Sequence, residues 1–495
     1  MKKNDNIKIN KEDFEFVQND KKLYDQKFET KRIGYFADAM QRFSQNKGSI
    51  VAGVILLIMI MFSVIAPFVS GYEAQTRDDF YTYCLPKVQL FEGTGFWDGT
   101  KTEVTNEKFF AYYESYGAVR SYTVGEDEFG EKQYTIVRDT YIAGCVYKTF
   151  SAKDFVAMDE YDKSIENLED KIFQPLIDTS WIDTSTNNGM VLENLYKQNA
   201  NYSYKLTMKM APIFVTDDDG NQVLDYCYLK DDAGNYVYSK QDGNTYSTRL
   251  NYDNYYKYLH NGNSPYFTLG SDQYGRDIMT RLAIGGRLSL TLGFTVSLVN
   301  IILGVVYGAI EGYYGGATDI VMERISEILS EVPFMIVVTL FSLYLADVVN
   351  PVISLFLAFV VTGWIGTAAT TRMQFYRYKG QEYVLAARTL GARDSRLIFK
   401  HILPNAVGPI ITSSVLMIPS VIFSESSLSY LKIIDFSTGN ITSIGTMLSE
   451  GQATFMTYPN LILWPAIFIS LLMICFNIFG NGLRDAFNPQ LRGAE

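Results

Sequence analysis

The sequence predicts an α-helical polytopic membrane protein with six transmembrane helices and an α+β extracellular domain between the first and second helices. Two observations support this prediction. Apolar runs of about 20 residues, long enough to cross a hydrocarbon core of roughly 30 Å, occur near the start of the chain and again only after residue 286. A polar, tyrosine-rich region, residues 71–268, lies between them. The averages, with 47% hydrophobic residues and a mean hydropathy near zero, conceal this segregation.

The first predicted span, residues 49–70, contains no charged residue and follows a mostly polar tail, residues 1–48. A secretory signal peptide has a short n-region and an apolar stretch of only about 7–15 residues. We therefore interpret this span as a retained membrane anchor. The other five predicted spans are residues 287–310, 333–346, 351–370, 407–424 and 458–480. The span at 333–346 is short.

Lysine and arginine indicate the orientation, because they accumulate in short cytoplasmic loops. Basic residues cluster before the first span and between the fourth and fifth spans, whereas the loop "DVVN" between the third and fourth spans has none. Both chain ends, including a tail over residues 481–495, are therefore expected in the cytoplasm, and residues 71–268 outside the cell. The clustered basic residues are Lys27, Lys31, Arg32, Arg42, Lys47, Arg372, Arg377, Lys379, Arg388, Arg393, Arg396 and Lys400.

The region between the first two spans has the composition of a folded, acidic domain. Residues 71–270 contain 18 Lys and Arg against 31 Asp and Glu, so their net charge is −13 and that of the remaining chain is +2. Helical spacing of apolar residues over 151–173, behind Ser151 as a cap, predicts a helix. A β-meander is predicted where aromatic and β-branched runs alternate with turn dipeptides. These dipeptides are Asp219-Gly220, Gly234-Asn235 and Asp242-Gly243.

The tyrosines and cysteines of this region each allow two interpretations. The region holds 24 of the 36 tyrosines, which could form a binding platform for peptides or glycans, or serve as ordinary strand residues, the interpretation that we favour. Cys84, Cys145 and Cys227 are interpreted as small buried thiols rather than as one disulfide with an odd thiol. The acidic stretch "DDDGN" lacks the ligand spacing of a calcium loop and is typical of a hairpin turn.

Several kinds of catalytic chemistry are excluded by the sequence. No G-x-x-x-x-G-K-[ST] phosphate loop occurs. His260 and His401 are the only histidines, which argues against a histidine metal cluster or a conventional Ser-His-Asp site. The chain itself is therefore not expected to be an enzyme, and no cofactor or metal is assigned to it.

A mixed-charge stretch, residues 382–405, lies between the fourth and fifth predicted spans. Gly391 can adopt the left-handed conformation that ends a first short helix, and Asp394 can cap a second one. Pro404 follows at a position where helices commonly stop. The residues that share an apolar face of the two helices are Tyr383, Ala386, Ala387 and Leu390, then Leu397, Ile398 and Ile402. From these patterns alone, a helical hairpin packed on its own bundle and a docking site for another protein are equally favoured.

The segment "LAARTLGARDSRLIFKHILP" resembles the coupling loop, also called the EAA loop, of ABC importer permeases, although Leu385 stands where that loop usually has Glu. The matching positions are Ala386, Ala387, Gly391, Leu403 and Pro404. Four further segments are similar to the C-type permease subunit of oligopeptide and dipeptide importers. They are residues 269–293, 312–334, 424–431 and 476–492. The large insert after the first span is not the common form of that family.

The resemblance implies the type I ABC importer permease fold, with a five-helix permease core over residues 269–480 and a cytoplasmic coupling loop at 381–405. It also implies partners: a second, B-type permease subunit, two ATPase subunits that use ATP and Mg, and an extracellular substrate-binding lipoprotein. Peptide would cross the lipid of a bacterial cell membrane by alternating access, a two-state change that nucleotide and substrate bias. No nucleic acid partner is expected.

The resemblance assigns contact with an ATPase subunit to ten residues of the coupling loop: Glu382, Tyr383, Leu385, Ala386, Ala387, Leu390, Gly391, Asp394, Leu403 and Pro404. Polar residues at membrane depth normally face a protein interior or a cavity, and they are candidates for the translocation path. These candidates are Asn300, Glu311, Glu425 and Asn477. For Glu311 and Glu425 we favour a simple position at a span end. The segment "SDQYGRDIMTRLAIGGRL" is expected to form an amphipathic helix at the outer interface.

Two alternatives to a peptide permease remain at this point. Related permeases carry nickel chelates, glutathione or oligosaccharides, so the solute could be one of these. A membrane-anchored receptor, in which the outer domain binds a ligand, belongs to a different functional class. The coupling loop argues against the receptor, since a receptor needs no docking site for an ATPase.

Overall fold

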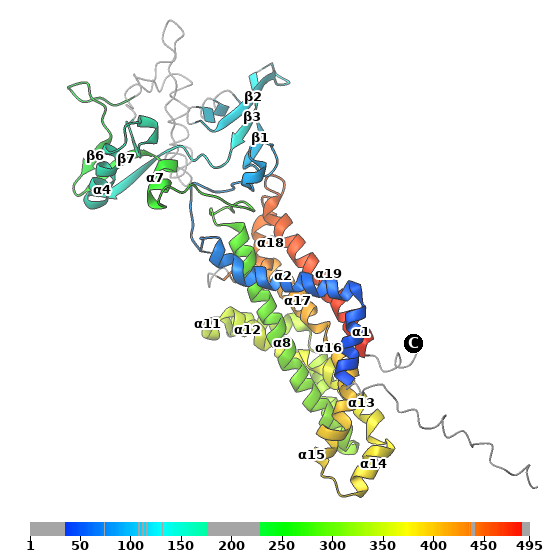
Figure 1. The fold of residues 1–495 in the computed structure, drawn as a ribbon. Helices are drawn as coiled ribbons and strands as arrows, with labels where there is room; N and C mark the ends of the chain where they lie inside the picture. Colours follow the sequence, from blue (N-terminus) through cyan, green and yellow to red (C-terminus); the bar gives the residue numbers. More distant parts are fainter. Residues whose placement is uncertain are drawn as a thin grey trace, which may run out of the picture.

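The computed structural model describes residues 35–176, 228–434, 436 and 441–487, apart from residues 74, 107–108, 111–112, 115–116 and 131. Long helices form an elongated bundle, strands gather at one end of it, and the short helices α14 and α15 lie at the other end (Figure 1). Five helices, or continuous helical stretches, are long and apolar enough to cross a membrane, and a sixth span is possible if one bent helix pair counts as a span. The structure is thus that of a helical membrane protein.

Helices α1 (Tyr35–Gln45) and α2 (Lys47–Val69) open the described chain, and Asn46 caps α2 by accepting a hydrogen bond from the Ser49 amide at 3.2 Å. The first predicted span is confirmed as a helix. Its buried residues recur every three or four positions, and the opposite side is exposed and apolar, as expected for a helix with one face on a bundle and one in lipid. The buried residues are Ser49, Ala52, Leu56, Met59, Ser63 and Ala66.

Helix α8 (Ile278–Tyr314) is a single helix of 37 residues. The prediction of a separate amphipathic helix at the outer interface is therefore wrong. Ile278 and Leu282 are buried in the bundle core, and Arg281 is buried in ion pairs with Asp272 (2.6 Å) and Glu450 (2.8 Å). Because these carboxylates neutralise its charge, the arginine does not have to reach water, and the helix continues into the span.

The next helices are α9 (Gly316–Ser330), α10 (Phe334–Tyr344) and α11 (Ala346–Val349), followed by α12 (Pro351–Gly363) and α13 (Ile365–Lys379). The predicted short span at 333–346 corresponds to α10, whose 11 residues cover only about 16 Å. It is bent by 72° from α9 at a break that contains Pro333. Helices α12 and α13 together make one stretch of 29 residues that can span a membrane.

The chain then forms α14 (Glu382–Thr389) and α15 (Asp394–Arg396), followed by a π-helical turn (Leu397–Ile402) that leads into α16 (Leu403–Ser414). Helices α17 (Met417–Tyr430), α18 (Ile444–Gln452) and α19 (Asn460–Phe487) complete the bundle. The capping box at the start of α18, formed by Ser443 and Thr446, satisfies two backbone amides of that helix.

Helices α8 and α13 approach each other closely along a row of small residues on α8. Gly304 and Gly312 leave no room for a side chain, since a Cβ atom there would lie 2.6 Å from Thr367 and 2.7 Å from Phe375. Gly308, between them, packs against the backbone of Ala368. A glycine at every fourth position allows two membrane helices to pack backbone to backbone, so α8 and α13 form a tight pair.

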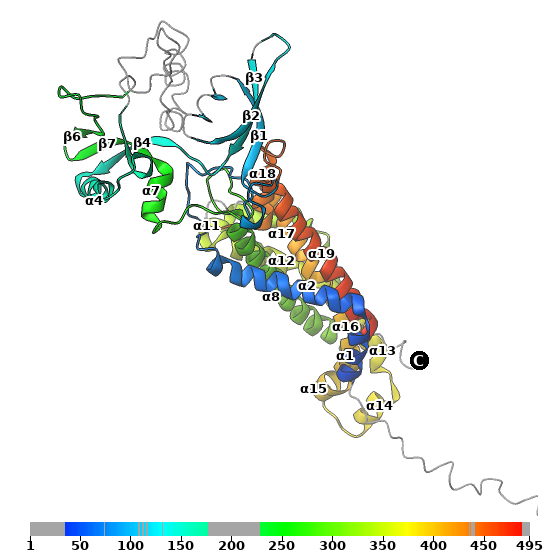
Figure 2. The same ribbon diagram turned by 45° about the horizontal axis from the view of Figure 1, so that its top comes forward.

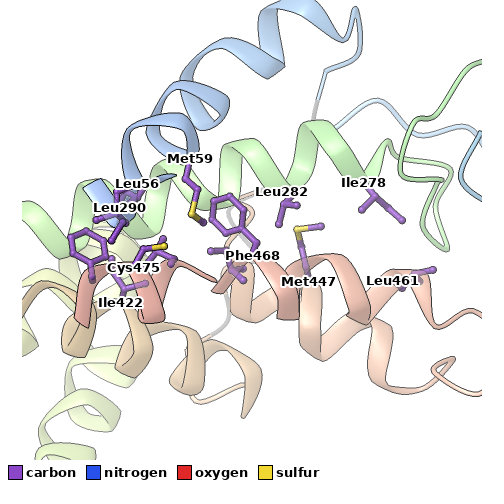
Figure 3. Close-up of a cluster of buried hydrophobic side chains, with 14 residues drawn as sticks. Leu56, Met59, Ile278, Leu282, Leu290, Ile422, Met447, Leu461, Phe468 and Cys475 are labelled. Carbon is purple, nitrogen blue, oxygen red and sulfur yellow. The ribbon is translucent and has the colours of Figure 1, made fainter. Parts of the chain in front are cut away.

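A second contact surface unites α2, α8, α17, α18 and α19 in one hydrophobic core. Met59 of α2, Leu290 of α8 and Phe468 of α19 converge there, with Ile422 of α17 and Met447 of α18 beside them (Figure 3). Chain segments more than 400 residues apart therefore pack side by side in this core, and α8 contributes to it with Ile278, Leu282 and Leu290 of its first half.

Two small antiparallel sheets lie between α2 and α8 in the sequence. The first has the order β1-β3-β2, from strands β1 (Thr100–Asn106), β2 (Val119–Glu126) and β3 (Lys132–Asp139), and both outer strands pair with β3. The second has the order β4-β7-β5, from β4 (Cys145–Ser151), β5 (Phe173–Gln174) and β7 (Thr245–Asn251), and β6 (Ser239–Asp242) also pairs with β7. The connections carry the 3₁₀ turns η2 (Gln89–Phe91) and η3 (Leu168–Asp170).

The β-meander prediction holds for one hairpin of this region. The Asp242-Gly243 turn joins β6 to β7, and Gly234 forms a turn with positive φ, whereas Asp219-Gly220 lies outside the described residues. The strands β4 and β5 pair with the much later β7, so the sheet is not sequential. Long-range pairing of this kind leaves no local signal in a turn dipeptide, which is why the pattern did not reveal it.

Helices α4 (Ala152–Lys163) and α7 (Tyr252–Leu259) pack on the second sheet. Ser151 caps α4 as predicted, accepting from the Asp154 amide at 3.3 Å, but the helix ends ten residues before the predicted 173. It ends there because the buried Asp162 carboxylate accepts the amides of Ile172 and Phe173 at 2.8 and 2.7 Å, which turns the chain back toward β7.

Many tyrosines of this region are core residues. Tyr81 is fully buried and donates to Asp253 at 2.7 Å, and Tyr252 donates to Asp78 at 2.9 Å. Burial, together with the adjacent carboxylates, raises the pKa of both phenols. At these positions, which lie in a turn and in α7 rather than in the strands that the favoured interpretation expected, tyrosine fills the core and satisfies a buried carboxylate. Cys145 carries a thiol, the Cys84 thiol points at the backbone carbonyls of Tyr81 and Thr140, and Cys227 lies outside the described residues.

Candidate functional site

The coupling loop, residues 381–405, lies at the end of the bundle opposite the strands (Figure 2). Glu382 in the first turn of α14 and Arg388 in its last turn interact favourably with the helix dipole, which stabilises a helix of only eight residues. Val384 is fully buried in a hydrophobic cluster with Phe375 of α13 and Leu397 of the π turn. The loop is therefore packed on the bundle and does not hang from it.

The side of α14 that packs on the bundle differs from the predicted apolar face. Val384 and Ala387 point inward, whereas Tyr383, Ala386 and Leu390 are exposed. Leu385 is exposed as well, and Leu390 is 88% exposed at the tip of the loop. With Phe399 of the π turn, which is also exposed, these side chains present an apolar surface at the end of the bundle. We call Tyr383, Leu385, Leu390 and Phe399 the loop-tip surface.

Gly391 has its predicted role, whereas Asp394 does not. Gly391 has φ of +81° and ends α14, as predicted. Asp394 is not the cap of the next helix, because Arg393 occupies that extended position and Asp394 is the first helical residue. Its carboxylate instead accepts a hydrogen bond of 2.6 Å from the hydroxyl of Tyr313 at the end of α8.

The prediction that a helix stops at Pro404 is wrong. The chain continues helical from Asp394 to Tyr430, apart from local irregularities, and Pro404 sits in the first turn of α16. A proline lacks the amide proton that an α-helix needs, and the π turn before it changes the pairing so that Leu403 donates to Ile398. The side chain of Asn405 donates to the carbonyl of His401 at 2.8 Å, one turn before it.

Tyr313 and Lys379 fasten the loop to the C-terminal end of α8. Besides donating to Asp394, the Tyr313 hydroxyl lies 3.4 Å from a guanidinium nitrogen of Arg388. Lys379, at the end of α13, donates to the carbonyl of Gly312 at 2.9 Å. The coupling loop, α13 and α8 are thus joined at one point by hydrogen bonds as well as by apolar packing.

Arg372 of α13 forms an ion cluster that sequence reasoning missed. Its guanidinium pairs with Asp319 at 2.6 Å and Glu323 at 2.7 Å, both on α9, and lies 3.4 Å from Glu311 of α8. Tyr376 adds a hydrogen bond to Asp319 at 2.6 Å. A signal existed in the sequence, since acidic residues in the motif 312–334 need a basic partner at the same depth, but the partner is about fifty residues away.

The four polar candidates for the translocation path lie apart from one another. Glu311 is buried near the C-terminal end of α8 beside Arg372. Glu425 of α17 is fully buried and accepts from three serine hydroxyls: Ser289 at 2.6 Å, Ser429 at 3.1 Å and Ser426 at 3.2 Å. It therefore ties α17 to α8 in the bundle interior.

The two asparagines differ in their surroundings. Asn300 is buried on α8, where its amide nitrogen lies 3.4 Å from the carbonyl of Phe359 on α12 and its side-chain oxygen has no hydrogen-bond partner among the described residues. Asn477 is exposed on α19 and donates to the carbonyl of Met473 in its own helix. Neither asparagine shares a contact with the two glutamates.

A second ion cluster, also missed, lies at the opposite end of α8. Asp272 and Glu450 pair with both Arg276 and Arg281 at distances of 2.6 to 3.0 Å, and they connect the start of α8 to α18. Each end of α8 is therefore fixed to its neighbours by a cluster of buried or half-buried charges. Within the described part of the chain, no group of three or more His, Cys, Asp or Glu residues is arranged to hold a metal ion.

Comparison with known families matches two segments of the chain. Residues 292–493 match the family described as "Binding-protein-dependent transport system inner membrane component", and residues 34–85 match the "N-terminal TM domain of oligopeptide transport permease C". Most of the region that carries the two sheets lies between these matches.

Individual relatives agree with the family matches. The oligopeptide transport system permease protein OppC of Bacillus subtilis (strain 168) is 42% identical over 223 residues, which are 45% of this chain and 72% of that protein. The dipeptide transport system permease protein DppC of the same strain is 40% identical over 45% of this chain and 68% of that protein. OppC of Escherichia coli (strain K12) is 37% identical over 45% of this chain and 72% of that protein.

Proposed function

Because this chain belongs to the family of binding-protein-dependent transport system inner membrane components, we propose that it is the permease subunit of an ATP-driven importer that moves oligopeptides or dipeptides across the cytoplasmic membrane. The likeness to peptide permeases over the whole helical core is the observation that carries this proposal. The chain alternates between an outward-open and an inward-open state, and a peptide enters from one side and leaves on the other.

The loop-tip surface docks an ATPase subunit. It is apolar, it lies at the extreme end of the bundle, and water covers it in the isolated chain. An exposed apolar patch on a short helix is suited to the groove of a partner protein. Leu385, in place of the glutamate usual in this loop, increases the apolar share of the contact. Glu382 and the exposed basic residues Arg393 and Arg396 provide a polar rim.

Motion of the docked ATPase reaches the spans through the inner end of α8. Tyr313 joins α8 to Asp394 of the loop, Lys379 joins α13 to Gly312, and Arg372 joins α13 to α9. Because packed helices held by hydrogen bonds move as rigid bodies, displacement of the loop displaces α8, α9 and α13 together. Helix α8 is about 55 Å long at 1.5 Å per residue, so it carries this movement to its outer end.

The same geometry suggests roles for the polar candidates. Glu311 and Glu425 have their hydrogen-bonding capacity used by Arg372 and by three serines, which favours a structural role. Asn300 and Asn477 keep unused capacity, because one has an unpaired oxygen and the other is exposed. We assign the exposed Asn477, rather than the glutamates, to the surface that peptide or the second permease subunit contacts, whereas the buried Asn300 lies between α8 and α12 and does not reach that surface.

The topology and the partners complete the proposal. Residues 71–268 lie outside the cell and both chain ends lie in the cytoplasm, which agrees with the strands and the coupling loop lying at opposite ends of the bundle. The complete importer contains this chain, a B-type permease, two ATPase subunits that bind ATP and Mg, and an extracellular binding lipoprotein. The outer region contacts the lipoprotein or the second permease.

Leu390→Asp tests the docking role of the loop-tip surface. The side chain is 88% exposed, so the change leaves the fold intact, but it puts a charge where the ATPase groove is apolar. Burying one leucine contributes about 1.5–3 kcal/mol, so the dissociation constant for the ATPase subunits is expected to rise at least about tenfold. Co-purification of the ATPase subunits and uptake of a radiolabelled peptide in reconstituted vesicles are the measurements.

Leu259→Asp is the matched control, because Leu259 is an exposed leucine on α7 at the opposite end of the molecule. It should leave ATPase association unchanged. Normal ATPase association and uptake by Leu390→Asp would contradict the docking role of the loop. The substrate class is tested in the same vesicles by competition, where unlabelled peptides should displace the labelled peptide and nickel chelates, glutathione and oligosaccharides should not.

A further inference from the structure

The segment between Lys87 and Asp98 forms a rigid loop that projects apolar side chains into solvent. Leu90 is 83% exposed and Phe96 is 62% exposed. Both belong to the region between α2 and α8 that neither family match includes, since the first match ends at residue 85 and the second begins at 292. Exposed side chains of this size on a well-built loop indicate a surface that is covered by something in the assembled protein.

The loop is held in one conformation by its own hydrogen bonds. At its base, Val88 donates to the carbonyl of Trp97 at 2.7 Å, and Lys87 and Asp98 form a β-bridge. The Thr94 hydroxyl lies 2.7 Å from the carbonyl of Phe91, and the Gly95 amide donates to the Asp98 carboxylate at 3.0 Å. These bonds hold the backbone that carries Leu90 and Phe96, and both side chains stay largely exposed, although Phe96 also packs on the rings of Phe91 and Trp97.

An aromatic chain connects this loop to a membrane-spanning helix. Phe91 packs edge-on against Phe96, Phe96 stacks on Trp97 with ring centroids 5.4 Å apart, and Trp97 contacts Trp464 at 5.5 Å. Trp464 lies on α19, four residues after its start at Asn460. At 1.5 Å per residue it is about 6 Å from the start of that helix, so it lies in the first two turns of a helix that is long and apolar enough to cross a membrane.

Two further contacts fix the height of the whole region on α19. Tyr83 stacks on Tyr458 with centroids 4.4 Å apart, and the ammonium group of Lys101 on β1 lies 4.5 Å from the same ring. Strand β1 lies over α18 in both views (Figures 1 and 2). The loop therefore cannot lie far above the membrane, because its neighbours in space are the first residues of a spanning helix.

We propose that the loop between Lys87 and Asp98 inserts into the outer leaflet of the lipid bilayer, with Leu90 and Phe96 among the acyl chains and Trp97 and Trp464 at the interface. Tryptophan is enriched at the interface between the acyl chains and the headgroups, and here the indole N–H of Trp464 is buried against the protein. The apolar exposed residues of α19, Leu463 and Ile467, continue the same surface downward. Glu92 and Lys87, paired at 3.8 Å, remain at headgroup level. The loop would anchor the outer region at a fixed distance from the membrane, and this anchoring does not depend on the substrate.

Site-specific photocrosslinking in the assembled transporter tests this proposal. Phe96→p-benzoylphenylalanine and, separately, Leu90→p-benzoylphenylalanine place a photoreactive ring at an exposed position that tolerates an aromatic side chain. Irradiation in native membranes is followed by mass spectrometry of the peptide that spans the loop. The expected result is a phospholipid adduct at position 96, at position 90, or at both.

Phe129→p-benzoylphenylalanine is the matched control. Phe129 is 89% exposed and lies in the turn between β2 and β3, away from the bundle. It should give no lipid adduct above background. Crosslinks from positions 90 and 96 to protein subunits alone, no adduct at either position, or lipid adducts equally frequent at position 129 would each overturn the proposal.

Discussion

Replacing Tyr313 with phenylalanine removes a single hydroxyl group from the fastening between α8 and the coupling loop. That hydroxyl donates to Asp394 at 2.6 Å, and it lies 3.4 Å from Arg388. The ring itself stays packed against Phe375, Val384 and Leu397 in the hydrophobic cluster. The change therefore tests the hydrogen bond and not the packing of the loop.

The size of the effect follows from the environment of the two partners. A hydrogen bond to a charged group contributes about 1.5–3 kcal/mol. Tyr313 is buried, but Asp394 is exposed, and water can replace the phenol as its donor. We therefore expect a loss near the lower end, about 1.5 kcal/mol, which shifts the equilibrium between a fastened and a released loop about tenfold toward release.

The ratio of peptide molecules imported to ATP molecules hydrolysed is the appropriate measurement, made on the reconstituted transporter. Tyr313→Phe should lower this ratio several-fold while the ATPase subunits still co-purify, because the loop-tip surface is unchanged. Tyr314→Phe is the matched control, since the neighbouring Tyr314 is exposed. An unchanged ratio in Tyr313→Phe, or an equal fall in Tyr314→Phe, would refute the idea that movement passes through this hydrogen bond.

Three further predictions concern stability. Gly308→Val should lower the unfolding temperature, because overpacking costs about 1–3 kcal/mol and the new side chain meets the Ala368 backbone, whereas Gly366→Val has open space and should not. Glu425→Ala should destabilise the bundle by about 2–4 kcal/mol, because three serine hydroxyls lose their acceptor. Glu425→Gln should lower the stability much less, and the peptide preference should be unchanged in both variants. Burial raises the pKa of Asp98, but hydrogen bonds from Thr100 and Gly95 and the charge of Arg120 outweigh it, so the net pKa is lowered. Such a group stabilises the fold above its unfolded pKa and loses this contribution as the pH falls through its folded pKa, so Asp98→Asn should lower the unfolding temperature at about pH 6 and much less at about pH 3.

The spans and the turn of the coupling loop could be predicted because their signals are local. A run of about 20 apolar residues identifies α2 and α19 without any knowledge of their neighbours, and Gly391 needs only its own positive φ to end α14. The extension of α8 could not be predicted in this way. The predicted span starts at 287, after Arg281, whose charge is neutralised by Asp272 and by the carboxylate of Glu450, which lies 169 residues later.

The predictions of the inward face of α14 and of a helix end at Pro404 were wrong for different reasons. Residues 383–387 are apolar almost all round the helix, so periodicity gives no preference for Val384 over Tyr383; the position of Phe375 decides which side is buried. At Pro404 the usual stop signal is overridden by a π turn, which places the proline in the first turn of α16. Both outcomes depend on tertiary packing, which local sequence rules do not contain.

ATP-dependent peptide accumulation tests the central claim most directly. Vesicles that contain this chain, its partner permease, both ATPase subunits and the binding lipoprotein are loaded with ATP on the ATPase side, and a radiolabelled peptide is added on the other side. The account predicts that labelled peptide accumulates against its gradient with this chain present, and that no accumulation occurs when the chain is omitted or carries Leu390→Asp. Equal accumulation with and without this chain would contradict its role as a peptide permease subunit.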